Sequence, residues 1–276
     1  MRILFLGDIV GKPGVNLVRR ALPSIRQKEA IDFVVANAEN AADGSGLTVK
    51  QFHQLRQAGI DLMTMGDHIY KKREIIPLLN QDPAICRPAN FPDGAPGKEF
   101  ALGAAKGVQI AAVVLLGRTF MRPAECPYRT ADRVLAQLAG RAGIVIVDMH
   151  AEATADKYLL AHYLKGRVTA IFGTHTHVPT ADEQIFPGGT AFICDVGMCG
   201  PYTSILGRDI DNVLAAAVSF VPHSFNVATD DVRLSGAIID VDANNGRAVA
   251  IRRFVFAEKD AAAGLPPLAI TPAPRN

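Results

Sequence analysis

Short apolar runs alternate with amphipathic segments along most of this chain of 276 residues, and this alternation limits the fold more than any other sequence feature. Branched residues dominate the apolar runs and turn-forming residues bound them, as in buried strands. The segments between them carry apolar side chains at helical spacing, so the pattern predicts an α/β fold. The predicted strands are residues 3–6, 33–36, 62–65, 144–147, 168–172 and 191–194, and the predicted helices are 15–27, 49–58, 131–139 and 155–164.

Two further apolar regions have the pattern of antiparallel ribbons. One is residues 107–116, and the other joins residues 234–240 to residues 248–256 through a turn of two asparagines and a glycine. We therefore expect a mixed sheet or a pair of sheets, within a single domain over residues 1–260. Residues 261–276 are rich in alanine and proline without periodicity, and we expect them to form a solvated or surface-lying extension.

Composition and charge place the chain among ordinary globular proteins. Hydrophobic residues make up 49% of the chain and charged residues 20%. The net charge of +2 does not indicate binding to a nucleic-acid duplex or an anionic membrane. The four cysteines show neither CxxC pairing nor dense spacing, which favours a reducing compartment. No apolar run has the length of a secretion signal or a membrane helix. We expect a soluble cytoplasmic protein without membrane association.

Acidic and histidine side chains follow five of the predicted strands in turn. The carboxyl ends of strands border the ligand crevice in open α/β sheets, so these side chains are expected to converge. Taken alone, each of these residues could be a helix cap, a turn former or an ordinary hydrogen-bonded histidine. Three carboxylates and four histidines at equivalent positions are better explained by a shared site. The set is Asp8 after the first strand, Glu39 and Asn40 after the second, Asp67 and His68 after the third, His150 after the fourth, and His175 and His177 after the fifth.

The pair His175 and His177 is the sharpest single signal. In an extended chain, residues two apart face the same side, so both imidazoles can bind one metal ion or two neighbouring ions. Two divalent ions about 3.5–4 Å apart need anionic and preferably bridging ligands, and Glu39, in the middle of the set, is the candidate bridge. With Asp8, Asp67 and one bridging hydroxide, the negative charge balances two dications.

Motifs for other chemistries are missing from the sequence. Residues 7–13 differ from a P-loop in spacing, and Pro13 stands where that loop places a metal-binding hydroxyl. The chain has no GxSxG elbow, and none of the cysteines has a helix-start or cationic setting that would indicate a lowered thiol pKa. Nucleophilic serine or cysteine catalysis is therefore not supported.

Six segments carry a resemblance to a known family. They are residues 7–11 (GDIVG), 36–42 (ANAENAA), 66–68 (GDH), 148–154 (DMHAEAT), 173–177 (GTHTH) and 195–198 (DVGM). In these segments the chain resembles the calcineurin-like metallophosphoesterases and, within them, the YmdB-like bacterial cyclic-nucleotide phosphodiesterases, with weaker similarity continuing to about Phe256. The resemblance implies a four-layer sandwich, in which two stacked mixed β-sheets are flanked by helices.

The resemblance also implies roles for individual residues. His68 stands where the family keeps its catalytic imidazole, and Asp67 replaces the asparagine of the family's Gly-Asn-His motif. Aspartate still ligates through oxygen, but its charge is expected to hold the ions more tightly and to weaken their Lewis acidity. The implied metal ligands are Asp8 and His177 on one ion, with support from Asn40, and Asp67, His150 and His175 on the other, with Glu39 bridging.

The activity that the resemblance implies is hydrolysis of small phosphodiesters such as 2',3'-cyclic nucleotides or 3',5'-cyclic AMP, by attack of a metal-bridging hydroxide with His68 protonating the leaving oxygen. Mixed imidazole and carboxylate ligands suit two divalent ions of iron or manganese, or else zinc. The substrate could derive from RNA, and self-association into a homo-oligomer stays open. Two alternatives are a nucleotide- or RNA-associated regulatory protein that uses the metal site mainly for binding, and a metal-dependent amidohydrolase.

Overall fold

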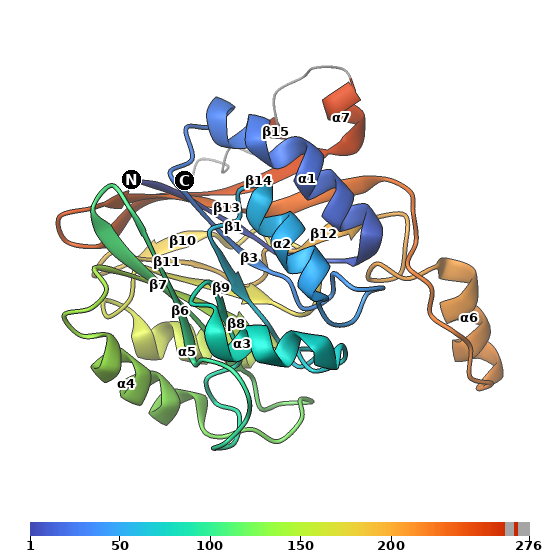
Figure 1. Cartoon of the computed structure of the whole chain (residues 1–276), viewed down its shortest axis with the longest axis horizontal. Coiled ribbons are helices and arrows are strands. Elements are labelled where there is room, and N and C mark those ends of the chain that lie inside the picture. The colour runs from blue at the N-terminus through green and yellow to red at the C-terminus, as the bar shows by residue number, and fades with distance from the viewer. Residues whose placement is uncertain (263–267, 270–276) are drawn as a thin grey trace.

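The computed structural model describes residues 1–262 and 268–269, which form two stacked β-sheets covered by helices on their outer faces (Figure 1). Among these residues, no helix combines the length and the apolar character that crossing a membrane requires. The helices are α1 (Gly11–Lys28), α2 (Val49–Gln57), α3 (Ile76–Gln81), α4 (Pro127–Leu138), α5 (Thr154–Leu164), α6 (Ile210–Ser219) and α7 (Glu258–Ala262), with a 3₁₀ turn at Arg73–Ile75.

The first sheet combines parallel and antiparallel strands. In order across the sheet these are β15 (Leu268–Ala269), β14 (Arg247–Ala257), β13 (Val232–Asp242), β1 (Arg2–Leu6), β3 (Phe33–Asn37), β4 (Leu62–Thr64) and β5 (Ile85–Cys86), while β12 (Met198–Pro201) pairs with both β13 and β2 (Asp8–Ile9). Strands β1, β3, β4 and β5 run parallel, and β13 and β14 form an antiparallel hairpin. The predicted hairpin is confirmed, with Gly246 in the turn at a φ of 70°, where a side chain would be strained.

The second sheet is also mixed. Its order is β10 (Gln184–Phe186), β11 (Thr190–Ile193), β9 (Ala170–Thr174), β8 (Ile144–His150), β7 (Val108–Leu116) and β6 (Phe100–Ala105). Strands β7, β8, β9 and β11 run parallel to one another, and β6 and β10 pair antiparallel with them at the two edges. The predicted ribbon at residues 107–116 thus has an antiparallel partner on one side and a parallel partner on the other. Together the sheets confirm the predicted sandwich.

The core explains why the strands of the second sheet read as continuous apolar runs. Along β7, Ile110, Ala112 and Val114 pack in the core shared with the first sheet. The alternate residues Ala111, Val113 and Leu115 pack in a separate core with side chains of α4 and α5. Both faces of the sheet are therefore buried, so its central strands are mainly apolar on both faces. The stacked rings of Phe5 and Phe172, with centroids 4.7 Å apart, join the two sheets.

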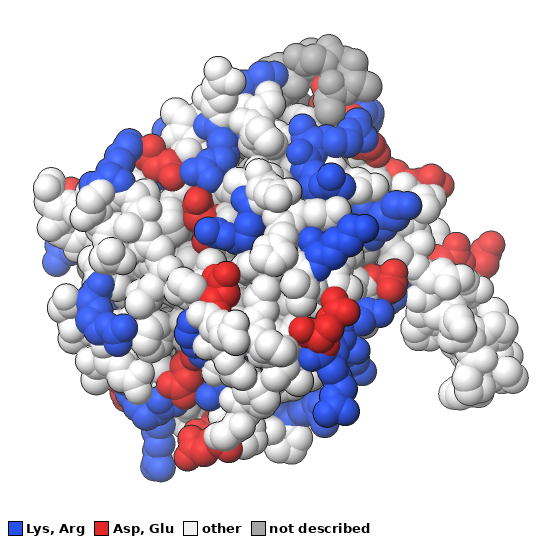
Figure 2. All heavy atoms as spheres, in the orientation of Figure 1, with Lys and Arg blue, Asp and Glu red and all other residues white. Residues whose placement is uncertain are grey.

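Charged side chains of both signs are interspersed on the face shown in Figure 2, in keeping with the net charge of +2. Helix α6 buries none of its residues and projects away from the sheets (Figure 1). Within the predicted extension, residues 261–262 end α7 and residues 268–269 form β15 at the edge of the first sheet. The remainder of that extension lies outside the described residues, and the single-domain boundary at residue 260 stays a prediction.

Candidate active site

The structure brings together every side chain that the sequence placed in the candidate site. The first sheet contributes carboxylates, an amide and His68 near the carboxyl ends of its strands, and the second sheet contributes the other three histidines. The five strand ends therefore belong to two facing sheets, whereas the prediction relied on the crevice of one open sheet. From the first sheet come Asp8 in β2, Glu39 and Asn40 after β3, and Asp67 and His68 after β4; from the second come His150, the last residue of β8, and His175 and His177 after β9.

One group of ligand atoms centres on His150. The atoms offered by Glu39, Asp67, His150 and His175 all lie within 4.8 Å of one another. From His150 Nε2 the distances are 3.1 Å to Glu39 Oε1, 3.3 Å to Asp67 Oδ1 and 3.0 Å to His175 Nδ1. Two carboxylates and two imidazoles so placed suit a divalent transition-metal ion.

A second group lies beside the first. His177 Nε2 is 3.7 Å from Asp8 Oδ1 and 3.2 Å from Asn40 Nδ2, and Asn40 also reaches Glu39 Oε1 at 3.4 Å. Asp8 is fully buried, yet its Oδ1 atom has no hydrogen-bond partner among the described residues. Buried polar atoms are almost always satisfied, so this oxygen fits a site that a cation completes. Glu39 stands between the two groups.

The ionisation of these residues follows from their mutual contacts. Burial opposes ionisation of Asp8, but the charge of His177 outweighs it and holds the pKa of Asp8 below its usual range. The same balance, with His150 as the partner, lowers the pKa of Asp67. The charge of Glu39 overcomes burial and raises the pKa of His150, whereas burial and the neighbouring His150 lower the pKa of His175. Asp8 and Asp67 are therefore carboxylates at neutral pH.

A buried hydrogen-bond network orients His150, and the sequence reasoning missed it. Asp148 accepts hydrogen bonds from the Thr64 hydroxyl at 2.6 Å, the Thr174 hydroxyl at 2.5 Å and the Asn37 amide at 3.0 Å. Because the Thr174 hydroxyl donates to Asp148, its oxygen accepts from His150 Nδ1, 2.8 Å away. With Nδ1 held by this contact, Nε2 of His150 faces the ligand group. The only signal in the sequence was that these polar residues lie at or near the ends of buried strands.

The predicted extended conformation of the histidine pair is wrong. Strand β9 ends at Thr174, and His175 and His177 have φ values of 89° and 64° in the left-handed region. The two imidazoles therefore face different groups rather than one side of a strand. Between them, the Thr176 hydroxyl donates to Asp195 at 2.5 Å, and Asp195 also accepts from the buried Lys157 at 2.7 Å. This network holds the strained segment in place.

His68 borders both groups without belonging to the tight cluster. Its backbone N–H donates to Glu39 Oε2 at 2.8 Å, and its Nδ1 lies 2.7 Å from Asn40 Oδ1. Its Nε2 lies 3.9 Å from Asp67 Oδ2, and about a third of the side chain is exposed. An imidazole fixed at one nitrogen, with the other open to the site, suits proton transfer.

The cysteines differ from the prediction at one position. Cys126 is the N-cap residue of α4, and the backbone N–H of Arg129 lowers the pKa of its thiol. The prediction failed because the helix begins at Pro127, earlier than the apolar periodicity indicated. Burial raises the pKa of Cys86 and of Cys199 to about 12, so those thiols are inert.

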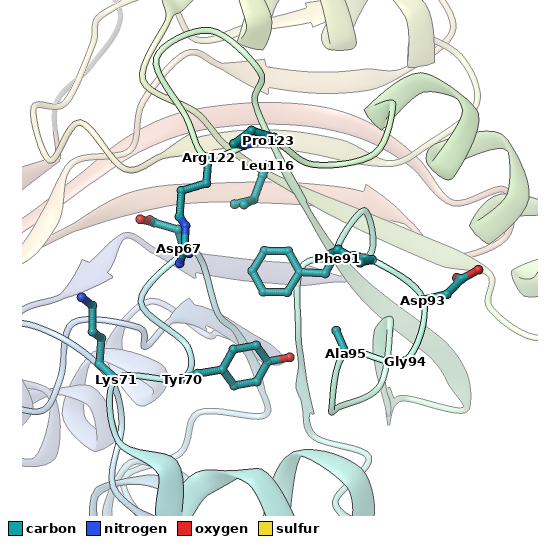
Figure 3. A pocket seen from close by; sticks show the side chains of 11 residues that line it. Asp67, Tyr70, Lys71, Phe91, Asp93, Gly94, Ala95, Leu116, Arg122 and Pro123 are labelled. Atoms are coloured by element: carbon teal, nitrogen blue, oxygen red, sulfur yellow. The ribbon is translucent and has the colours of Figure 1, made fainter.

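A cavity of about 640 Å³ opens directly beside the ligand groups (Figure 3), and the sequence reasoning gave no residues for it. Asp67 belongs both to its wall and to the cluster around His150. The cavity lies between the segment after β4 and two loops, residues 91–95 and 116–123, which are far apart in the sequence. Its lining residues are Asp67, Tyr70, Lys71, Phe91, Pro92, Asp93, Gly94, Ala95, Leu116, Arg122 and Pro123.

Comparison with known proteins agrees with this geometry. The family model of the YmdB-like proteins matches residues 4–254. A 2',3'-cyclic-nucleotide 2'-phosphodiesterase of Bacillus subtilis (strain 168) is 45% identical over 256 residues, covering 93% of this chain and 97% of that protein. The crystal structure of a novel phosphatase from Mycoplasma pneumoniae has a TM-score of 0.87 at 31% identity and covers 93% of both chains. NAD nucleotidase of Haemophilus influenzae, with a TM-score of 0.56 at 13% identity over 93% of this chain and 56% of that one, shares the fold alone.

Two stacked mixed sheets with carboxylates and histidines at their shared edge define a metallophosphoesterase, and the structural neighbours agree. Within that class the family match covers most of the chain. The chain belongs to the YmdB-like family. The predicted resemblance is thereby confirmed.

Proposed function

We propose that this protein is a metal-dependent phosphodiesterase that hydrolyses small phosphodiesters, in particular 2',3'-cyclic nucleotides, with 3',5'-cyclic nucleotides as the second candidate class. The observation that supports it most is that carboxylates and imidazoles from two sheets converge in two adjacent groups, and that Asp8 Oδ1, a buried oxygen of the second group, has no hydrogen-bond partner among the described residues. The similarity to the Bacillus subtilis 2',3'-cyclic-nucleotide 2'-phosphodiesterase supports the substrate class.

The two groups of side chains would hold two divalent ions. Bound there, such ions supply Lewis acidity toward phosphoryl oxygens and lower the pKa of a water molecule. Imidazole and carboxylate donors together favour iron or manganese over magnesium, with zinc as a further candidate. We assign Glu39, Asp67, His150 and His175 to one ion and Asp8, Asn40 and His177 to the other, with Glu39 bridging.

His68 is the proton donor in this proposal. When water adds to phosphorus and the P–O bond to the ribose breaks, the leaving alkoxide needs a proton. His68 Nδ1 is hydrogen-bonded to Asn40, which leaves Nε2 for the leaving oxygen. A positioned general acid contributes about 10²–10⁴-fold to such a step.

The test compares the parent protein with Glu39→Gln, both purified without added metal or chelator. We expect the parent to contain close to two equivalents of transition metal and to hydrolyse 2',3'-cyclic AMP, and the variant to lose metal and activity together while its circular dichroism is unchanged. Full metal content in Glu39→Gln would remove the bridging role.

The rival functions give different results in the same assay. A metal-loaded parent that binds 2',3'-cyclic AMP without turning it over would indicate the regulatory protein. Turnover of an amide substrate, with none of the phosphodiester, would indicate the amidohydrolase. A cytoplasmic location, an RNA origin of the substrate and self-association stay proposals that rest on the sequence.

A further inference from the structure

The cavity beside Asp67 has a different character from the ligand groups. At 640 Å³ it lies within the range of about 300–1,000 Å³ that is typical of small-molecule sites. One end is the Asp67 carboxylate, whose Oδ1 is 3.3 Å from His150 Nε2. A phosphodiester at the two ligand groups would therefore extend the rest of its molecule into this cavity.

Aromatic side chains form one wall of the cavity. The rings of Tyr70 and Phe91 are tilted by 42° with centroids 5.9 Å apart, too close to admit a further ring between them. The Tyr70 hydroxyl donates to the Pro96 carbonyl at 2.6 Å, so it is already satisfied and fixes that ring. Figure 3 shows the Phe91 ring near the middle of the pocket. A planar ligand therefore has a ring face on which to stack.

Hydrogen bonds of the neighbouring residue Asn90 fix the wall that carries Phe91. The buried side chain of Asn90 donates to the Leu116 carbonyl at 2.9 Å and accepts from the Leu116 N–H at 2.8 Å. Asn90 also accepts, through its backbone carbonyl, from the N–H of Glu125. The loop before β6 and the loop after β7 are thereby held at a set separation. The aromatic platform is preformed and does not depend on the ligand for its position.

The other wall carries two cationic side chains, Lys71 and Arg122. Lys71 and Arg122 make no ion pair and no side-chain hydrogen bond with the residues that the structure describes. Figure 3 shows Arg122 extending from the loop after β7 toward the side of the pocket where Asp67 lies. A guanidinium in that place suits the negative charge of a phosphodiester.

We propose that this cavity is the nucleoside subsite of the enzyme, with the base stacked on Phe91 and the phosphodiester within reach of Arg122. The proposal rests on the phosphodiesterase function and specifies what the substrate carries besides the phosphate. Stacking on an aromatic ring is tolerant of base identity because every base has a π-face, and it contributes about 1–3 kcal/mol per base. The cavity therefore selects nucleoside phosphodiesters over simple ones without selecting one base.

Two substrates with the same five-membered cyclic phosphate test the role of Phe91. They are 2',3'-cyclic AMP and glycerol 1,2-cyclic phosphate, which has no base. In Phe91→Ala we expect kcat/KM for 2',3'-cyclic AMP to fall about 5- to 150-fold, mainly through KM, while the base-free substrate is unaffected. Phe91→Leu, which keeps the apolar volume, should show the same selective loss, and Phe91→Trp should restore the activity. Phe220→Ala, at an exposed phenylalanine after α6, is the matched control.

Arg122 should behave differently from Phe91 in the same assay. Because its partner is the phosphate, Arg122→Gln should lower kcat/KM for both substrates by roughly tenfold or more. Arg19→Gln, at an exposed arginine of α1, should change neither. Equal losses on both substrates in Phe91→Ala and Phe91→Leu would overturn the assignment of the base to this wall.

Calorimetry with a nucleotide separates this inference from the proposed function. We expect the parent to bind adenosine 3'-monophosphate more tightly than glycerol 2-phosphate, and Phe91→Leu to lose that difference. Binding of both at equal strength by the parent would overturn the subsite. Preferential, Phe91-dependent binding by a parent that hydrolyses neither cyclic phosphate would leave the subsite standing and refute the phosphodiesterase.

Discussion

Each imidazole of the site is oriented by a contact at the nitrogen that faces away from the ligand groups or the substrate. His150 uses the Thr174 hydroxyl, His177 uses the Leu206 carbonyl at 3.0 Å, and His68 uses Asn40. His175 Nε2 lies 3.3 Å from the Glu152 carboxylate, which leaves Nδ1 for the cluster around His150. Such outer partners set both the tautomer and the ring orientation of metal-binding histidines.

At the residue scale, substitution of His68 should affect the chemical step and leave metal binding unchanged. His68→Ala should retain both metal equivalents but slow the hydrolysis of 2',3'-cyclic AMP by about 10²-fold or more. The loss should shrink for bis-p-nitrophenyl phosphate, because a good leaving group needs no proton. His53→Ala, at an exposed histidine of α2, serves as the control. A loss of the same size on both substrates would show that His68 positions the phosphate instead.

Asp67 is the proposed metal ligand at which the resemblance implies a departure from the Gly-Asn-His motif. A carboxylate donates more negative charge to a bound ion than an amide does, and this makes the coordinated water less acidic. Asp67→Asn should therefore move the alkaline activation of turnover to lower pH and weaken metal binding. The measurement is a pH–rate profile with both proteins saturated with manganese, beside the exposed control Asp43→Asn. An unmoved profile with unaltered metal affinity would exclude Asp67 from the metal site.

At the scale of elements, α5 and the segment after β9 are tied together by one buried ion pair. Lys157 of α5 and Asp195 are about 2% and 1% exposed, and both contact Thr176, which lies between His175 and His177. The left-handed conformations of those histidines cost free energy that local contacts must offset. The helix therefore supports the site without touching it.

Breaking this ion pair should weaken both the fold and the site. Lys157→Met leaves the Asp195 carboxylate buried without its partner, and loss of one member of such a pair costs about 3–5 kcal/mol. We expect the free energy of urea unfolding to fall by that amount and the metal content to drop. Lys165→Met, at the exposed lysine after the same helix, should have little effect. Full metal content in Lys157→Met would show that the network stabilises the fold alone.

At the scale of the whole molecule, the site lies where the two sheets meet. Each ligand group takes carboxylates or amides from the first sheet and histidines from the second. An ion bound in either group would therefore join the two sheets. Glu39, the proposed bridge, belongs to the first sheet and contacts His150 of the second.

Metal removal should consequently destabilise the whole protein. A ligand that binds only the folded state at a concentration 100-fold above its Kd adds about 2.7 kcal/mol of stability. For a chain of this size we expect the melting temperature to rise by about 5 °C on adding manganese to chelator-treated protein. Glu39→Gln should not respond. An equal rise in that variant would mean that the ion binds elsewhere.

The sequence could predict much of the fold because strand and helix patterns are local. The run from Ile3 to Leu6 lies inside β1, and the helical periodicity at residues 15–27 lies inside α1. Helix α6 was missed because it buries no residue, so no tertiary contact selected its pattern. Strands β2 and β5 have two residues each, too few for a period to show.

The sequence by itself determined which side chains reach the site, because a polar residue at the end of a buried strand has a position set by the strand. Asp8, Glu39, Asp67 and His150 follow that rule. Only the tertiary structure decided that their strands belong to two facing sheets, and that His175 and His177 turn in different directions from left-handed backbone. It also decided the cavity, which loops distant in sequence build around Phe91 and Arg122. The physical reason is the sequence distance between the interacting residues. Strand patterns arise from neighbouring residues, whereas the packing of sheets and loops depends on contacts between residues far apart in the chain.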